Sequence, residues 1–326
     1  MTAFERAISR RALLGAAGLL PLAGCTGQDR PAVAPTSGPA GSPTAAAASA
    51  TASAASGAAA SSEHHAELTT LERKFGRTLG VYALATGTKA TIAHRADDRF
   101  AFCSTFKGLA VAAVLKGKPL SGLGQVIRYT SDDLMPSSKI TELHVGTGMS
   151  IRDLCHAAVV HSDGTAGNLL LDLVGGPAGL TRYLRGLGDR VTRCDRREPN
   201  LTTAIPGDPR DTTTPRAIGG DYQRIVLGEA LPSAKRDFLR DLLERANVSP
   251  ASKGRIRAGV PKGWTVADKT GTGSYGTMND IAIVWPAKSA PPLVIAIMAR
   301  GTDQSVVGGD NEVIAAAARY VTATLT

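Results

Sequence analysis

One serine and one lysine have the spacing that covalent catalysis needs. Ser104 and Lys107 lie three positions apart, and the apolar residues after them repeat at helical intervals. Residues three apart share one face of a helix, so the alcohol and the amine would meet on its first turn. Unpaired N–H groups and the positive dipole end there stabilise an oxyanion and lower the proton affinity of a nearby lysine. Of the eleven lysines only Lys107 has a serine three positions before it, although this spacing alone could also mark a solvated helix face.

A second lysine stands among glycine and hydroxyl-bearing residues near the C-terminus. Lys269, Thr270 and Gly271 follow a short β-branched run at 264–267 and precede Thr272. A lysine on a strand suits an anionic substrate, and small neighbours allow the substrate backbone to lie along that strand. Taken by themselves, these residues could equally form a turn after the strand.

Two further motifs lie between these lysines, Ser162-Asp163-Gly164 and Glu198-Pro199. The order Ser-x-x-Lys, Ser-Asp-Gly, Glu-Pro, Lys-Thr-Gly resembles that of the class A serine β-lactamases. The resemblance runs from about residue 68 to the C-terminus. Three longer segments agree as well: 99–107, 204–215 and 267–273. Together these motifs are specific for the family, and they imply an enzyme that opens β-lactam rings and gives antibiotic resistance.

The resemblance assigns a role to each motif. Ser104 would attack the lactam carbonyl, and the backbone N–H groups of Ser104 and Thr272 would form the oxyanion hole. Lys107, or Glu198 through a water molecule, would accept the serine proton, and which of them does so is disputed for the family. Ser162 would relay a proton to the departing nitrogen. We therefore expect an acyl-enzyme mechanism with Lys269, Thr270, Gly271 and Thr272 binding the substrate.

Glu198 decides whether the enzyme turns over. An acyl-enzyme ester persists unless a water molecule is activated beside it, and a carboxylate on an ordered loop supplies that base. By resemblance Arg196 and Asp211 would pair across the neck of this loop, although either could instead be an exposed charge of little energetic value.

Four positions depart from the usual family pattern. Met278 stands where many members have an arginine that binds the substrate carboxylate, so we expect Arg255 to supply this charge, with a solvated arginine as the alternative. Gly164 replaces an asparagine that would bond the substrate side chain, and Ser137 replaces an aromatic wall of the pocket. Thr202 replaces an asparagine that helps to hold the hydrolytic water, which predicts slow deacylation unless a neighbour compensates.

The elements that must position these residues are visible as periodic patterns. Helical spacing of apolar residues occurs in five segments of the middle of the chain: 106–115, 151–160, 166–174, 179–187 and 221–229. Strand patterns occur at 79–84, 264–267, 280–285 and 293–298, and 311–324 resembles a closing helix. The last two strands are too close together for a crossover helix. We expect an α/β (α+β) fold with an antiparallel sheet domain built from both termini (63–95 and 247–326) and an all-helical domain (96–246).

The first 62 residues precede this catalytic unit of 63–326. Residues 1–25 have the charged start, apolar middle and small-residue end of an export signal, with Arg10 and Arg11 resembling the twin-arginine type. They end at Cys25 in a sequence that resembles a bacterial lipobox, although a buried helix with a chance cysteine is the alternative. Residues 26–62 are rich in Ala, Ser, Gly and Pro, which predicts a flexible tether. We expect an exported protein in the cell envelope or secreted, with membrane contact only through a lipid on Cys25.

Composition excludes several other classes. The chain has 326 residues, 43% of them apolar, and 37 basic against 28 acidic residues. The basic residues are scattered without aromatic partners, so we expect no nucleic-acid partner. The six histidines and four cysteines show no metal-ligand spacing, and we expect no metal and no cofactor. With Cys25 set aside, Cys103, Cys155 and Cys194 are odd in number, so at least one thiol should stay free. We also expect a monomer.

Two alternative functions remain open at this stage. A penicillin-sensitive D,D-peptidase shares the Ser-x-x-Lys and Lys-Thr-Gly motifs but is trapped as its acyl-enzyme, and Glu198 argues against it. A non-catalytic, lipid-tethered envelope binding protein is the other, and the intact motif residues argue against that.

Overall fold

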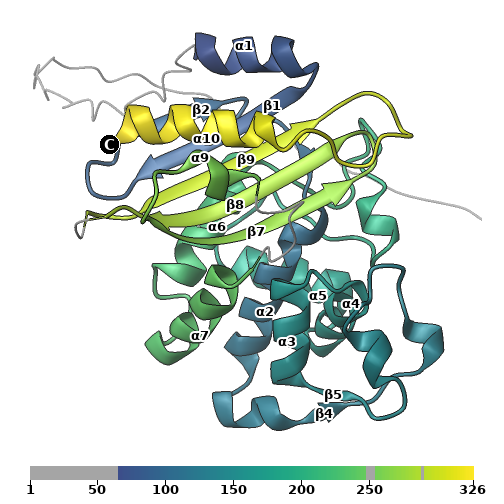
Figure 1. Ribbon diagram of the computed structural model, residues 1–326. Helices are drawn as coiled ribbons and strands as arrows, with labels where there is room; N and C mark the ends of the chain where they lie inside the picture. The colour runs from purple at the N-terminus through teal and green to yellow at the C-terminus, as the bar shows by residue number, and fades with distance from the viewer. Residues whose placement is uncertain (1–64, 247–253, 288–289) are drawn as a thin grey trace, which may run out of the picture. The chain divides into compact units, whose positions relative to one another are not determined.

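A five-stranded antiparallel sheet forms the centre of the computed structural model, which describes residues 65–246, 254–287 and 290–326 (Figure 1). Its strand order is β2-β1-β9-β8-β7, and every neighbouring pair is antiparallel. The strands are β1 (Thr78–Ala85), β2 (Thr91–His94), β7 (Thr265–Gly273), β8 (Thr277–Trp285) and β9 (Leu293–Arg300). Strands from early and late parts of the chain thus pair directly, which confirms the predicted sheet.

Both faces of this sheet are covered, and β9 shows why its sequence is apolar throughout. Ala296 and Met298 face the core shared with the middle of the chain, whereas Ile295 and Ile297 face a second core. Successive side chains of a strand point to opposite faces, so a strand buried on both sides needs no polar residues. The second core is closed by α1 (Ala66–Phe75) and α10 (Glu312–Leu325).

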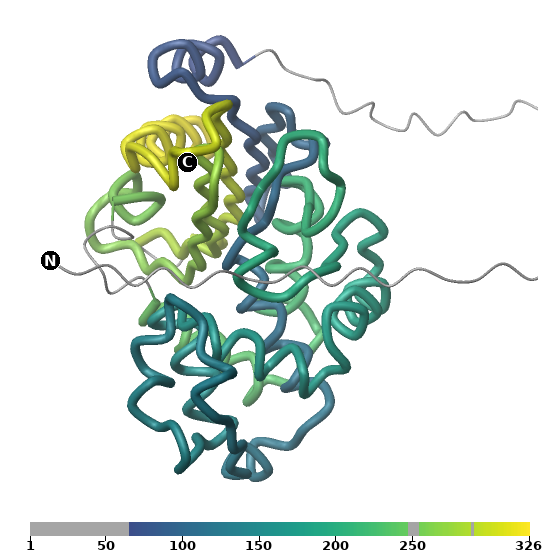
Figure 2. The backbone as a smooth tube through the Cα atoms, turned by 90° about the vertical axis from the view of Figure 1, so that its right-hand side faces the viewer, coloured from purple at the N-terminus to yellow at the C-terminus, as the bar shows by residue number. Residues whose placement is uncertain are grey.

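The middle of the chain supplies the remaining helices, and Figure 2 shows them on the far side of the sheet from α10. They are α2 (Phe106–Gly117), α3 (Ile151–Val160), α4 (Gly164–Leu173), α5 (Gly176–Gly186), α6 (Pro215–Val226) and α7 (Ser233–Glu244). The short α9 (Ile256–Gly259), later in the chain, packs instead beside α10 (Figure 1). Every residue of α2 from Phe106 to Leu115 is buried, as expected for a helix that is apolar all round. The helix that follows the predicted nucleophile is therefore the fixed centre of this part.

Short elements connect these helices. The single-turn helices are η1 (Cys103–Thr105), η2 (Leu120–Gly124), η3 (Ser131–Asp133), η4 (Thr141–His144) and η5 (Asn200–Thr202). Two small ladders pair β3 (Phe100–Ala101) with β6 (Thr212–Thr213) and β4 (Val126–Ile127) with β5 (Met149–Ser150). The part predicted to be all-helical thus also contains strands, which were too short to give a period-2 pattern.

One boundary differs in a way that matters for the site. The sequence placed Lys269 after a strand at 264–267, but β7 continues to Gly273, and Lys269 pairs with Ile281 of β8. Residues 268–273 are mostly polar or small, so they show no apolar alternation that would predict a strand. Pairing with β8 holds this part of β7 in place. Lys269 therefore lies on a strand, as its proposed role requires, and the alternative of a turn at this position is wrong.

The cysteines of the described residues carry no disulfide. Cys103, Cys155 and Cys194 are all free and buried, which confirms that at least one thiol stays unpaired. Burial raises the pKa of Cys103 and that of Cys155 to about 12, so both remain neutral thiols. The predicted export signal, Cys25 and the 26–62 tether lie outside the described residues. Within the described part of the chain, no helix has both the length and the apolar character needed to cross a membrane.

Candidate active site

Ser104 lies in the single turn η1 that leads into α2, and two buried side chains fix the backbone around it. Asn279 of β8 donates through Nδ2 to the carbonyls of Ala101 (2.8 Å) and Phe102 (3.1 Å). The Tyr222 hydroxyl donates to the Thr105 carbonyl at 2.7 Å. Because both donors come from buried elements, the serine is presented by a rigid segment.

Lys107 connects three oxygens beneath the site. It is completely buried, and its Nζ lies 3.1 Å from Ser104 Oγ, 2.7 Å from the Ser162 carbonyl oxygen and 2.8 Å from Glu198 Oε1. Ser104 Oγ in turn donates to Glu198 Oε1 at 3.3 Å. One hydroxyl therefore touches both groups that could take its proton.

Glu198 is held by a residue that sequence reasoning did not single out. Asn168 of α4 donates through Nδ2 to the Glu198 carbonyl, while its Oδ1 accepts from the Glu198 backbone N–H, both at 3.0 Å. This double contact satisfies both backbone groups of the glutamate and fixes where its carboxylate can reach. The available signal was an asparagine one turn after Gly164, at the start of an otherwise apolar Leu-rich segment.

The loop of residues 196–211, here called the Glu198 loop, is closed at its neck as predicted. Arg196 forms an ion pair through Nε with Asp211 Oδ2. The other Asp211 oxygen accepts from the backbone N–H groups of Asp195 (2.8 Å) and Arg196 (2.9 Å), and the carboxylate is completely buried. The predicted pairing across the loop is confirmed, and its burial distinguishes it from an exposed ion pair of small energy.

Gly164 leaves room for the inward position of Glu198. A Cβ atom at this glycine would lie 3.0 Å from Glu198 Oε2 and 2.8 Å from Ser137 Oγ, both closer than ordinary contact. Asp163, just before it, caps α4 by accepting from the Ala166 N–H at 2.9 Å. Its other oxygen accepts from the backbone of Ile140 at 3.0 Å, which ties the opposite wall of the site to the same turn.

Ser162 links the two lysines. It adopts a left-handed backbone with φ of 58°, which is uncommon for a residue with a side chain and typical of functional sites. Its carbonyl faces Lys107, while its Oγ accepts from Lys269 Nζ at 3.1 Å. Burial and the positive charge of Lys107 lower the pKa of Lys269 to about 7. The Ser162 hydroxyl thus lies beside an amine that exchanges protons near neutral pH.

Arg255 reaches the strand that carries Thr272. Its Nη2 donates to Thr272 Oγ1 at 2.7 Å, and its Nη1 donates to the carbonyls of Gly271 and Asn279, each at 2.7 Å. The guanidinium is almost wholly buried, which lowers its pKa from the ordinary value. Met278, which replaces the usual arginine, pairs with Thr272 across the two strands. Arg255 therefore brings positive charge to the position that Met278 leaves uncharged.

Thr202 uses its hydroxyl within its own turn. Its Oγ1 donates to the Pro199 carbonyl at 2.7 Å, and its own carbonyl accepts from the Ser274 N–H at 3.1 Å. A hydroxyl has one proton to donate, so this bond leaves Oγ1 able only to accept from a water molecule.

These residues meet in a cleft of about 680 Å³. The predicted residues that line it are Ser104, Ser162, Glu198, Thr202, Arg255, Thr270, Gly271 and Thr272. Lys107 and Lys269 are buried and reach it through their contacts with the two serines. Gly164 does not line the cleft but packs beside Glu198 and Ser137.

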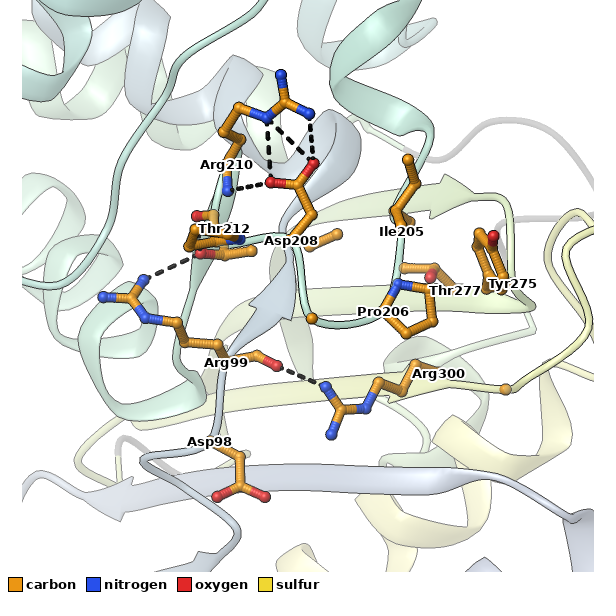
Figure 3. Close-up of a pocket in the computed structure, with 15 residues that line it drawn as sticks. Asp98, Arg99, Ile205, Pro206, Asp208, Arg210, Thr212, Tyr275, Thr277 and Arg300 are labelled. Carbon is orange, nitrogen blue, oxygen red and sulfur yellow. Dashed lines mark hydrogen bonds and ion pairs between the residues drawn. The ribbon is translucent and has the colours of Figure 1, made fainter.

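A second cavity, of about 260 Å³, lies on the other side of the Glu198 loop (Figure 3). Its charged side chains are engaged with protein groups: Arg210 with Asp208, and Arg300 with the Arg99 carbonyl at 2.9 Å. None of the predicted catalytic residues lines it. In the described parts of the chain, no group of three or more His, Cys, Asp or Glu residues is arranged to hold a metal ion.

A serine hydroxyl that contacts a lysine and a carboxylate, in a cleft between an antiparallel sheet and a helical part, is the arrangement typical of a serine hydrolase. The model of the β-lactamase enzyme family matches residues 63–325. The chain therefore belongs to the β-lactamase enzyme family, as a class A serine β-lactamase.

Named relatives agree along most of the chain. Beta-lactamase FAR-1 of Nocardia farcinica is 48% identical over 262 residues, which cover 80% of this chain and 82% of that protein. A solved β-lactamase structure from Desulfarculus baarsii is similar with a TM-score of 0.77 at 47% identity, covering 80% of this chain and 96% of that one. A class A β-lactamase from Clostridium kluyveri gives a TM-score of 0.76 at 42% identity, covering 79% and 97%.

Proposed function

We propose that this enzyme, which hydrolyses β-lactams and gives resistance to them, does so through an acyl-enzyme on Ser104. The contact of Ser104 Oγ with both Lys107 Nζ (3.1 Å) and Glu198 Oε1 (3.3 Å) is the observation that carries the proposal. Attack on the lactam carbonyl forms the ester bond and breaks the C–N bond of the ring. The serine proton passes to Lys107 or to Glu198, and the hydroxyl contacts both groups directly, although the Glu198 route can also run through a water molecule when substrate is bound.

Ser162 completes the first half-reaction. The departing lactam nitrogen needs a proton, and the Ser162 hydroxyl lies between the cleft and Lys269 Nζ. With its pKa lowered to about 7, Lys269 can resupply that hydroxyl at neutral pH. Donors placed on the developing oxyanion, here the backbone N–H groups of Ser104 and Thr272, are worth roughly 2.7–4 kcal/mol each in other serine enzymes.

Glu198 carries the second half-reaction. Its carboxylate lies against Ser104 on a backbone clamped by Asn168, so a water molecule beside the ester would meet a base whose position is fixed. Proton removal from that water leads to its attack on the ester carbonyl, which releases the ring-opened product and returns the proton to Ser104.

Recognition of the substrate carboxylate falls to the edge strand. Lys269, Thr270, Gly271 and Thr272 lie on β7, and Arg255 donates to the Thr272 hydroxyl at 2.7 Å. Arg255 is already engaged with strand carbonyls, so it acts on the substrate largely as a nearby positive charge and by orienting the Thr272 hydroxyl.

The Ser104→Ala variant tests the covalent step. Intact mass after brief exposure to a penicillin should show one adduct on the wild type and none on the variant. An adduct that persists on Ser104→Ala would contradict the assignment. A wild-type adduct that forms once without steady-state hydrolysis of nitrocefin would indicate a D,D-peptidase instead.

We also propose that the protein is a monomer exported with the 1–25 segment and anchored by a lipid on Cys25. The support is the residue pattern of that segment, with Arg10, Arg11 and a lipobox-like end. Cys25→Ala should release active enzyme into the soluble envelope fraction or the medium, and unchanged membrane association would contradict lipidation. Stable attachment needs more than one acyl chain, so mass analysis of the N-terminus should show at least two. Light scattering of the purified enzyme tests the monomer.

A further inference from the structure

Arg77 occupies a cradle made by three glycines. It lies between α1 and β1, and its Nη1 donates to the Gly276 carbonyl at 3.2 Å. A Cβ atom would lie 1.4 Å from Nη1 if added at Gly276 and 2.4 Å from it at Gly301, and at Gly309 it would lie 2.7 Å from Nη2. The guanidinium therefore fills the space in which these residues would otherwise carry side chains.

The cradle depends on shape more than on charge. The guanidinium bonds a backbone carbonyl, and within the described residues it forms no ion pair. A planar, rigid guanidinium can lie between three backbone segments, whereas a lysine ammonium is a compact point charge on a flexible stem. Arg77 thus fills the space between backbone segments that are far from it in sequence.

The three glycines belong to segments that meet at the end of β7. Gly276 lies in the β7–β8 turn, Gly301 follows β9, and Gly309 lies in residues 302–311, here called the rim loop, which leads from β9 to α10 (Figure 1). The Gly276 N–H donates to the Val306 carbonyl at 2.7 Å, so the turn and the rim loop are bonded where Arg77 contacts both.

The rim loop reaches the substrate-binding edge of the active site. Its Asn311 accepts through Oδ1 from Arg255 Nε at 2.9 Å. Its Gly308 donates to the Gly273 carbonyl at 3.1 Å, and a Cβ at Gly308 would lie 3.1 Å from Thr272 Cγ2. Displacement of the rim loop would therefore move the partners of both Arg255 and Thr272.

We propose that Arg77 is a positioning residue for substrate recognition, holding the rim loop against the β7–β8 turn so that Thr272 and Arg255 keep their places. The proposal rests on the proposed function, in which these two residues bind the substrate carboxylate. Arg77 itself touches no reacting atom. The Thr272 backbone, with its oxyanion-hole N–H, is held in the β7–β8 ladder opposite Met278, so loss of Arg77 should mainly affect the Thr272 hydroxyl and Arg255. The effect should therefore appear in the binding of the substrate more than in the chemistry at Ser104 and Glu198.

The first test is the Arg77→Ala variant. The KM for a penicillin should rise about three- to tenfold while kcat changes by less than about twofold, because the displaced groups bind the substrate carboxylate and do not touch the reacting atoms. Arg77→Lys should restore only part of the loss. Arg73→Ala is the matched control, since Arg73 is exposed on α1 and donates to the neighbouring Thr70 hydroxyl. A merely stabilising role would lower the melting temperature and leave KM unchanged.

Gly309→Ala gives an independent test that does not remove Arg77. The added methyl should expel the guanidinium and raise KM in the wild-type background, but it should add little in Arg77→Ala, where the space is empty. Additive effects on KM would overturn the proposal, as would a normal KM in Arg77→Ala. Arg255→Ala distinguishes failure of this proposal from failure of the proposed function. If Arg255→Ala raises KM and Arg77→Ala does not, only the role of Arg77 is wrong. If Arg255→Ala leaves KM unchanged, the recognition of the substrate carboxylate by Arg255 is wrong.

Discussion

The two sides of the Glu198 loop carry similar charges but arrange them differently. On the cleft side, Lys107 and Glu198 are 0% and 6% exposed and converge on one serine hydroxyl. On the other side, Arg210 and Asp208 are 50% and 12% exposed and bond each other (Figure 3). Exposed pairs are screened by water and contribute little, whereas buried groups that converge on a reacting atom change its chemistry. Burial and convergence, rather than the number of charges, distinguish the catalytic side.

The largest expected difference follows from removing one carboxylate from each side. Glu198→Gln keeps the backbone clamp to Asn168 but loses the base, so turnover should fall by roughly 10²–10⁴-fold while the acyl-enzyme accumulates. Asp208→Asn weakens the pair with Arg210 and a 3.8 Å contact with Arg196, but Arg196 keeps its pair with Asp211 at the neck of the loop, so turnover should be unchanged. Steady-state hydrolysis and intact mass measure both effects, and wild-type turnover in Glu198→Gln would reduce Glu198 to a loop charge.

The pH profile of activity should distinguish the buried Lys269 from an exposed lysine. The pKa of Lys269 is lowered to about 7, so the ammonium loses its proton as pH rises through that value. The kcat/KM for carboxylate-bearing substrates should then fall by up to about tenfold for each pH unit above it. Lys269→Arg should move this alkaline limb upward, and Lys262→Ala, at an exposed lysine, should leave it in place. A flat profile between pH 6 and 9 would contradict the role of Lys269.

Lys269 also makes the free energy of unfolding depend on pH, in the direction opposite to its effect on activity. Between about 7 and its ordinary value of 10.5, the unfolded chain binds more protons at this lysine than the folded enzyme does. Its contribution to the free energy of unfolding therefore increases with pH across that window, while activity decreases.

A smaller effect, this time a gain in turnover, is expected from Thr202→Asn. Because the Thr202 hydroxyl donates to Pro199, an asparagine amide should hold the hydrolytic water better and raise kcat about two- to tenfold without a matching change in acylation. The wild type should show a pre-steady-state burst with a penicillin. Thr203→Asn is the control, since the Thr203 hydroxyl is likewise bonded within the turn, to the Asn200 carbonyl. Absence of both burst and gain would show that Thr202 does not limit the reaction.

The smallest effect is predicted for the charged pair on the other side of the loop. Arg210→Ala removes the exposed partner of Asp208 but no contact with the cleft. The urea midpoint and kcat/KM should both match the wild type within error. A clear loss of turnover in this variant would show that the two sides of the loop are coupled.

The sequence indicated the residues that gather around the cleft better than the residues that hold them in place. Lys107 was recognisable because its partner lies three positions away, and the helix 151–160 because its apolar residues are periodic and its cap is local. Asn168 and Arg77 were not recognisable, because each acts on backbone far away in the sequence. The extension of β7 through Gly273 was missed for the same reason, since its partner strand determines it.

The buried cysteines determine what the enzyme requires of its surroundings. Cys103, Cys155 and Cys194 form no disulfide within the described residues, and burial keeps Cys103 and Cys155 from forming thiolates. The catalytic unit can therefore reach its active fold without any oxidant or disulfide isomerase. We therefore expect the purified enzyme to keep the same activity and melting temperature with and without a thiol reductant, so that a catalytic unit of this kind can be completed on either side of a cell membrane.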